Sequence, residues 1–320
     1  MSQEVHVAET RTLRVTGKEP VADGVVALTL ADPAGARLPD WTPGAHIDLI
    51  LPGGLVRQYS LCGDRWNPYT YRIAVLREPA GRGGSAYIHD VLDLGEAVGL
   101  GGPRNNFPLV PADRYLFIAG GIGITPLLPM VAQADLLGAD WALLYGGRRE
   151  ASIAFLENLA GYGDRVQIRP QDRYGLLDLP AFVDGHRPGT RVYSCGPAPL
   201  LAAVEQACAD LPPHTLRIER FVAAAHGRPL RSTPFQVELA RTGTVLTVPA
   251  HSSVLDVITA AGADVLSSCR QGVCGTCEVT VLAGEPDHRD SVLDDAERAA
   301  GTCMFVCVSR SRTDRLVLDL

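Results

Sequence analysis

The sequence predicts a multidomain protein: an antiparallel β-barrel, an α/β domain with a parallel sheet, and a small α+β domain. Three observations support this fold class. Short apolar runs alternate with turn residues in the first third, strands alternate with helices in the middle, and a hairpin, a short helix and a cysteine-rich loop follow near the end. A length of 320 residues suits two or three domains.

Residues 1–110 contain the apolar runs GVVALTL, AHIDLIL, RQYSLC and YRIAVL, with turn residues between them and no long helical pattern. This spacing predicts a small antiparallel barrel. Residues 111–224 are expected to alternate strand and helix, as a parallel sheet requires. The predicted strands are 115–121, 141–147, 166–170 and 191–197, and the predicted helices are 125–137, 152–161 and 198–211.

Residues 225–234 mix Ala, Gly and Pro with basic residues and are predicted to be a linker. Residues 235–320 form the third unit. We expect a hairpin around Thr242–Gly243 and a helix that Ser252 or Ser253 caps and Gly262 follows. This unit contains 12 acidic residues and 7 arginines, a net charge of −5. Such a surface is usually only solvated, but it would also steer a basic partner.

The composition excludes several functional classes. Hydrophobic residues make up 46% and charged residues 20%, as in soluble globular proteins, and a net charge of −7 argues against nucleic-acid binding. Eight cysteines are too few for a disulfide scaffold, and the first residues lack a signal-peptide pattern, so we expect a cytoplasmic protein. The uncharged stretch 115–134 is long enough to cross a bilayer, but glycines and two prolines interrupt it. We therefore expect no membrane segment.

The third unit contains Cys269, Cys274, Cys277 and Cys307. The spacing C-x4-C-x2-C followed by a distant cysteine is typical of a plant-type [2Fe–2S] cluster. A zinc site would usually repeat the C-x2-C pair, and a redox dithiol would open a helix. Cys303 lies four residues before Cys307 and is the less suitable fourth ligand.

Two loops of the middle domain carry candidate ligand contacts. The segment GGIGITP follows a strand with Gly120, Gly121 and Gly123, and Thr125 and Pro126 are expected to begin a helix as cap and first residue. Such a helix start would bind a pyrophosphate, although a tight strand–helix turn explains the pattern equally well.

The segment CGP, residues 195–197, ends a later strand, where open α/β sheets bind ligands. Cys195 would pack against a nicotinamide or be an inert buried thiol. Arg148 and Arg149 follow the second strand, where an acidic residue would indicate NAD. They would meet a 2′-phosphate or be solvated loop charges.

The barrel segment RQYS, residues 57–60, offers an arginine for a phosphate, a tyrosine that can stack on a ring and a serine that can bond a ring nitrogen. GRGGS, residues 81–85, supplies small residues whose N–H groups can approach an oxyanion. Either motif alone would be unremarkable in a strand or a loop.

The order RQYS, GGIGITP and CGP resembles the ferredoxin–NADP reductase superfamily. With IAVLREPAGRGGS, GPRNNFPL, EPDHRDSVLDD, CVSRS and LVLDL, the whole chain is similar to the phthalate dioxygenase reductase and vanillate demethylase reductase family. Asn106, Gln58 and the pair Arg148–Arg149 depart from or vary within that pattern. The resemblance implies a reductase that takes a hydride from NADH, with NADPH possible, and passes single electrons through FMN and a [2Fe–2S] cluster of a β-grasp ferredoxin domain to an oxygenase.

The resemblance also implies which residues form the site. The flavin contacts would be Arg57, Gln58, Tyr59, Ser60, Ala74, Val75, Leu76, Arg82, Gly83, Gly84, Ser85, Thr125 and Phe221. The nucleotide contacts would be Gly120, Gly121, Gly123, Pro126, Arg148, Cys195, Gly196 and Pro197. Ser60 and Cys195 are expected to orient the two rings rather than react covalently.

The predicted electron acceptor is a terminal oxygenase of the Rieske type, with a cytochrome P450 as the alternative. A non-enzymatic protein that binds a metal through its cysteines is a more remote alternative, which would lack flavin absorption.

Overall fold

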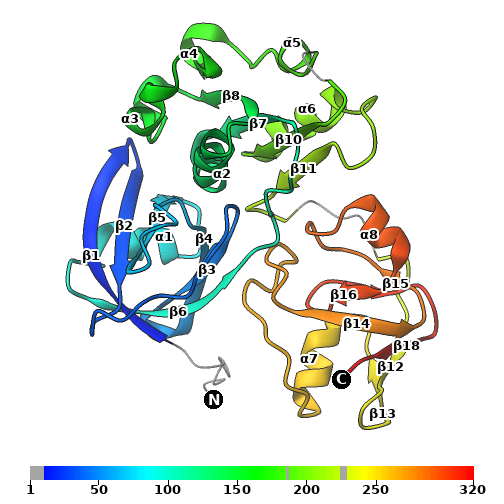
Figure 1. The fold of residues 1–320 in the computed structure, drawn as a ribbon. Helices are drawn as coiled ribbons and strands as arrows, with labels where there is room; N and C mark the ends of the chain where they lie inside the picture. Colours follow the sequence, from blue (N-terminus) through cyan, green and yellow to red (C-terminus); the bar gives the residue numbers. More distant parts are fainter. Residues whose placement is uncertain (1–10, 185–186, 224–228) are drawn as a thin grey trace. The chain divides into compact units, whose positions relative to one another are not determined.

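A computed structural model describes residues 11–184, 187–223 and 229–320 (Figure 1). The described chain divides into two compact units, one within Glu9–Glu219 and the other within Arg220–Leu320. The first unit contains the barrel and the α/β domain, and the second contains the cysteine-rich domain. Residues 1–10 and the first part of the predicted linker, 225–228, lie outside the described residues.

The barrel is a six-stranded antiparallel sheet in the order β4-β3-β6-β1-β2-β5, as the alternating apolar runs predict. An isolated antiparallel bridge between Leu61 and Ile73 joins its two edges. Alternate side chains such as Leu28 and Leu30 are fully buried inside it. Its elements are β1 (Arg11–Ala22), β2 (Val25–Ala31), β3 (His46–Leu51), a 3-10 turn (Pro52–Gly54), β4 (Leu55–Ser60), β5 (Thr70–Leu76), α1 (Gly84–Asp90) and β6 (Ala97–Arg104).

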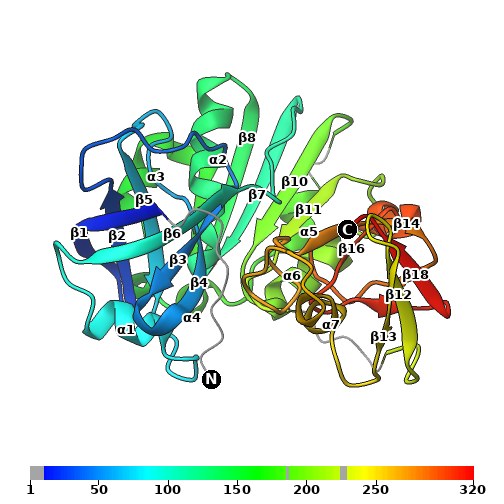
Figure 2. The ribbon, with the colours of Figure 1, turned by 90° about the horizontal axis from the view of Figure 1, so that it is seen from below.

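The α/β domain is a five-stranded parallel sheet in the order β11-β10-β7-β8-β9 (Figure 2). Four of these strands match the prediction, and β11 was not predicted, although its short segment LRIE alternates apolar and polar residues. The strands are β7 (Arg114–Gly120), β8 (Asp140–Gly147), β9 (Val166–Pro170), β10 (Thr190–Cys195) and β11 (Leu216–Glu219). The helices are α2 (Ile124–Leu136), α3 (Leu156–Leu159), α4 (Gln171–Tyr174), α5 (Leu179–Val183) and α6 (Ala198–Ala207), with 3-10 turns at Gly121–Gly123, Glu150–Ser152 and Ala160–Arg165.

The predicted helix over 152–161 is wrong in length, since the α-helical part is only α3. Phe155 directly before it has a left-handed φ of 63°, and Gly163 has φ 58° and ψ −135° inside the following 3-10 turn. These conformations interrupt the helix at both ends. By contrast, the uncharged stretch 115–134 folds as β7, a glycine turn and α2, as predicted. No helix in the described part of the chain is long and apolar enough to span a membrane.

Helix α2 joins the α/β domain to the barrel through a shared apolar core. Leu127 and Met130 of α2 lie in one buried cluster with Val25, Ala27 and Ala74 of the barrel strands. Burial of this apolar surface contributes roughly 25 cal/mol per Å², so the two domains form one stable unit. The opposite face of the parallel sheet is covered by α5 and α6.

The third domain has a mixed five-stranded sheet in the order β13-β12-β18-β14-β16, in which β12 and β18 are parallel. The hairpin around Gly243 is confirmed, and Ser253 caps α7 by accepting a hydrogen bond from Asp256 N. Val254 and Ile258 of α7 are buried in the sheet's core. The elements are β12 (Phe235–Leu239), β13 (Thr244–Val248), α7 (Val254–Ala260), β14 (Glu278–Ala283), β15 (Pro286–Asp287), α8 (Asp295–Ala300), β16 (Cys303–Phe305), β17 (Arg310–Ser311) and β18 (Arg315–Leu318).

Candidate functional site

Arg57 on β4 is held beside the loop that follows β5. Its Nη2 donates to Arg82 O at 2.8 Å, and its Nη1 donates to Val56 O at 2.7 Å. Gly84 must lack a side chain here, because a Cβ atom would lie 2.7 Å from Arg57 Cγ. Burial and the nearby Arg82 guanidinium lower the pKa of Arg57. Two guanidinium groups that repel one another fit a site for a doubly charged phosphate.

The loop at residues 81–85 has room for such a group. Gly83 has a left-handed φ of 82° and open space where a Cβ would stand. Ser85 Oγ accepts a hydrogen bond from Glu78 N at 3.0 Å, which fixes the loop. Open space beside fixed backbone suits the approach of an oxyanion.

Tyr59 and Ser60 end β4, while Ala74, Val75 and Leu76 end β5. Burial raises the pKa of Tyr59 to about 12, so its phenol stays neutral. Val75 points into the barrel core, whereas Ala74 and Leu76 contact the core shared with the α/β domain. These two residues therefore face the space between the domains.

Gln58 is engaged inside the barrel. Its Nε2 donates to Asp48 Oδ1 at 2.9 Å, so its side chain positions β3 against β4.

The glycine turn after β7 packs directly on the CGP segment after β10. A Cβ on Gly123 would lie 2.2 Å from Cys195 O, and one on Gly120 would lie 2.8 Å from Pro197 Cδ. Strands β7 and β10 are neighbours, and the chain order reverses between them. Open parallel sheets bind ligands at this switch point, so the two motifs meet where a nucleotide is expected.

The start of α2 differs from the prediction. Thr125 does not cap the helix, and Pro126 is not its first residue, because the turn Gly121–Gly123 lets the helix begin at Ile124. Thr125 is buried, and its Oγ1 donates to Ile122 O at 3.0 Å. Gly121 has φ 54° with open space above it, which leaves room for a ligand at the turn.

Glu219, at the end of β11, is a site residue that the sequence reasoning missed. The Cys195 thiol hydrogen-bonds its carboxyl group, with Sγ 3.9 Å from Oε2, and the buried Ser60 hydroxyl lies near the same carboxyl without a hydrogen bond of ordinary geometry. Burial raises the pKa of Glu219 to about 8, against smaller lowering contributions from Ser60 and Cys195. Its sequence signal is the segment IERF, in which it lies two residues before Phe221. Ser60 of the barrel, Cys195 of the parallel sheet and the protonatable carboxyl of Glu219 therefore lie close together.

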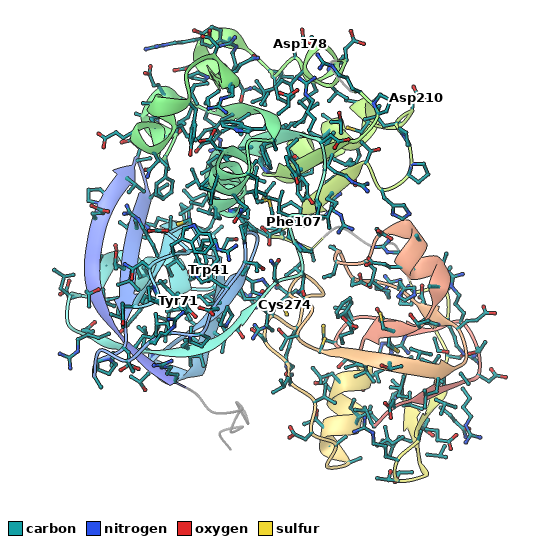
Figure 3. The ribbon with its side chains drawn as sticks, viewed as in Figure 1. Trp41, Tyr71, Phe107, Asp178, Asp210 and Cys274 are labelled. Carbon is teal, nitrogen blue, oxygen red and sulfur yellow. The ribbon has the colours of Figure 1, made fainter. Side chains whose placement is uncertain are left out.

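The cysteine loop of the third domain, in which Figure 3 labels Cys274, turns at two glycines with left-handed φ. Gly272 and Gly275 have φ of 68° and 69°, and a Cβ on Gly272 would lie 2.6 Å from Val308 Cγ2. Gln271 N donates to Cys269 Sγ at 3.3 Å, and Thr276 N donates to Cys274 Sγ at 3.4 Å. Amide groups aimed at sulfur stabilise thiolate ligands.

The four predicted ligands lie near one another, three of them in this loop and Cys307 just after β16. Cys274 interacts with Cys269, and Cys307 interacts with both Cys269 and Cys277. Cys303 lies instead on β16 beside Glu278. Two neighbouring pairs of thiols fit a cluster in which each iron takes two of them.

Comparisons with known proteins agree with this geometry. A family profile for the 2Fe-2S iron-sulfur cluster binding domain matches residues 237–312. The phenoxybenzoate dioxygenase subunit beta of Ectopseudomonas oleovorans is 46% identical over 97% of both chains. A solved structure of phthalate dioxygenase reductase, described as modular for electron transfer from pyridine nucleotides to [2Fe-2S], is 38% identical over 98% of each chain, with a TM-score of 0.71.

The chain belongs to the phthalate dioxygenase reductase family. It is therefore an NAD(P)H-dependent iron–sulfur flavoprotein reductase, whose cofactors are FMN and a [2Fe–2S] cluster. An intact type IV self-sufficient cytochrome P450 monooxygenase is also similar, at 43% identity and a TM-score of 0.92 over all of this chain. This chain covers only 43% of that P450 chain.

The flavin and nucleotide contacts implied by the reductase resemblance all remain predictions, those of Phe221 and Arg148 included. Phe221 is 41% exposed and falls in the unit that holds the third domain, so its place beside the flavin is untested. Arg148 is exposed directly after β8, at the carboxyl edge of the sheet.

Proposed function

We propose that this reductase delivers electrons from NADH to a Rieske-type oxygenase that acts on an aromatic substrate. The observation that carries the proposal is the meeting of Ser60, Cys195 and Glu219 where the barrel and the parallel sheet join. A flavin held by β4 and a nucleotide held at the switch point would approach one another there.

The chain's residues would act mainly by position. FMN, when bound, supplies the conversion of a two-electron hydride donor into one-electron transfers. Arg57 and the loop at 81–85 would hold its phosphate, and Tyr59 would pack along its ring. Cys195 and Ser60 would hold the two rings in contact, which lowers the barrier by fixing their geometry.

Glu219 would control the proton balance beside the two rings. Because burial raises the pKa of its carboxyl to about 8, the group carries a proton at neutral pH. A neutral carboxyl can donate a hydrogen bond and adds no negative charge near a hydride donor.

Arg148 is the residue that would meet the 2′-phosphate of NADPH, so it bears on the use of NADPH and not on the use of NADH. The Arg149 backbone is constrained, since its N donates to Ser152 Oγ at 3.2 Å and its O accepts from the same hydroxyl at 2.7 Å. We expect NADH to be preferred. Arg148→Ala should lower kcat/KM for NADPH about tenfold, a larger loss than for NADH. An equal loss of kcat/KM for both nucleotides would show that Arg148 does not contact the 2′-phosphate. Arg149→Ala is the matched control.

The partner would dock near the cysteine loop. Asp264 and Glu278 are exposed on either side of this loop, within a segment whose net charge is −5. Electron transfer to a basic oxygenase surface should therefore weaken as salt is added. A rate independent of ionic strength would argue against such docking.

A cytochrome P450 is the second candidate partner, because the fused P450 chain contains a segment similar to this entire protein. The separate relatives favour the Rieske partner, since one that matches over 97% of both chains is named a dioxygenase subunit. Reconstitution with one purified oxygenase of each type decides between them. Substrate turnover with the P450 alone would overturn the proposal.

A further inference from the structure

A cavity of about 430 Å³ opens at the end of the barrel where β4 and β6 end and β3 begins. Its lining includes Pro103, Arg104 and Asn105 of the GPRNNFPL segment and none of the flavin or nucleotide contacts named above. Its walls combine two tryptophans, three arginines and two prolines with short loop residues: Arg37, Asp40, Trp41, Thr42, Ala45, Arg65, Trp66, Pro68, Pro103, Arg104 and Asn105. Its volume lies in the range of roughly 300–1,000 Å³ that small-molecule sites occupy.

Buried donors in this wall lack acceptors. Trp41 is only 7% exposed, and its Nε1 finds no hydrogen-bond partner among the described residues. The Nε atoms of Arg65 and Arg104 are also buried without a partner in the described chain. Buried polar groups are nearly always bonded, so three unbonded donors on residues that line one cavity leave a place for an acceptor, although Trp141 Nε1 in the α/β core is also unbonded. Figure 3 shows Trp41 in the barrel near Tyr71.

The charge of the wall specifies the acceptor. Arg104 pairs with the buried Asp48 at 2.5 Å, and Arg37 pairs with the exposed Asp40 at 3.2 Å. Arg65 instead donates from Nη1 to the Gln133 amide oxygen at 3.1 Å and lies 4.4 Å above the Trp66 ring. Arg65 is thus a positive charge that faces the cavity with a neutral partner. One carboxylate would match it.

The remaining wall is apolar and suits a flat group. Trp66 is 64% exposed, an unusual state for so large a side chain, and Pro68 and Pro103 present further apolar surface. Aromatic faces attract planar rings, and apolar walls favour a ligand that is apolar apart from its one charged group. An inorganic anion would leave these surfaces uncovered.

We infer that this cavity binds a planar aromatic carboxylate, with the carboxylate at Trp41 Nε1 and Arg65 and the ring against Trp66. The site adjoins the flavin strand, because Ala45 O accepts the hydrogen bond from Leu61 N at 2.8 Å, directly after Ser60. The inference does not depend on which oxygenase is the partner.

Calorimetric titration of the FMN- and cluster-loaded protein with benzoate tests the inference. Benzoate should saturate one site per chain, and inorganic phosphate and benzyl alcohol should bind at least about tenfold more weakly, since each lacks half of the recognised chemistry. Trp41→Phe keeps the ring and removes the N–H, and Arg65→Gln removes the charge. Each should weaken benzoate about tenfold.

Trp141→Phe is the matched control. Trp141 is also buried with an unbonded Nε1, but it lies in the α/β core against Phe117 and Tyr162. Its variant should bind benzoate as the unmodified protein does. The inference is overturned by the absence of saturable binding at about 10 mM benzoate. It is equally overturned by phosphate or benzyl alcohol binding as tightly as benzoate, or by undiminished binding in both Trp41→Phe and Arg65→Gln.

Discussion

Replacement of Gly123 by alanine should separate the two motifs that meet at the switch point. Gly123 has an ordinary helical φ of −63°, so alanine meets no backbone strain there. Its Cβ, however, would lie 2.2 Å from Cys195 O and 2.4 Å from Cys195 C, more than 1 Å inside ordinary contact. Both neighbours are backbone atoms and cannot rotate away. Overpacking of this kind destabilises by roughly 1–3 kcal/mol, and a displacement of about 1 Å at a reacting centre can slow a reaction about 100-fold.

Stopped-flow measurement of flavin reduction by NADH, combined with urea unfolding, tests this expectation. Gly123→Ala should slow NADH-driven reduction about 100-fold while dithionite still reduces the flavin at the normal rate. Gly161→Ala is the control, because Gly161 has no atom within 4 Å of its Cβ position and lies in the same domain. A Gly123→Ala rate within about twofold of the Gly161→Ala rate would refute the packing argument.

Three further changes follow from the site. Arg57→Ala should weaken FMN binding about 10- to 100-fold, as fluorescence titration would show, and unchanged occupancy would remove Arg57 from the site. Because the Glu219 pKa is raised from 4.5 to about 8, the folded state binds the extra proton between those values, so stability should fall as pH rises through that window. Glu219→Gln should abolish this fall in urea unfolding at pH 6 and pH 8, and a persisting slope would point to another group. Cys307→Ser should abolish the cluster absorption while Cys303→Ser keeps it; the reverse result would exchange their assignments.

The sequence predicted the architecture well where local patterns determine it. Alternating apolar runs and turn residues predicted the barrel. Ser253 predicted a helix start, and Gly243 predicted a hairpin. The errors arose where tertiary contacts decide the outcome. Thr125 was predicted to cap the helix, but the turn at Gly121–Gly123 lets the helix begin at Ile124, one residue earlier.

The site shows the same division. The cysteine spacing and the glycine motifs identified cluster and nucleotide chemistry, because these groups demand particular residues at fixed separations. Glu219 has no such pattern, since only the pairing of β10 with β11 brings it beside Cys195. The cavity lined by Trp41 and Arg65 likewise could not be predicted from the sequence, because its walls come from three separate segments.

The central claim is that electrons pass from the nicotinamide through FMN to the cluster. Anaerobic mixing of NADH with the intact protein, with FMN-depleted protein and with FMN-refilled protein, followed at the cluster absorption, tests it most directly. The account predicts that NADH reduces the cluster in the intact and refilled samples and leaves it oxidised in the depleted one. Cluster reduction at the same rate without FMN would contradict it.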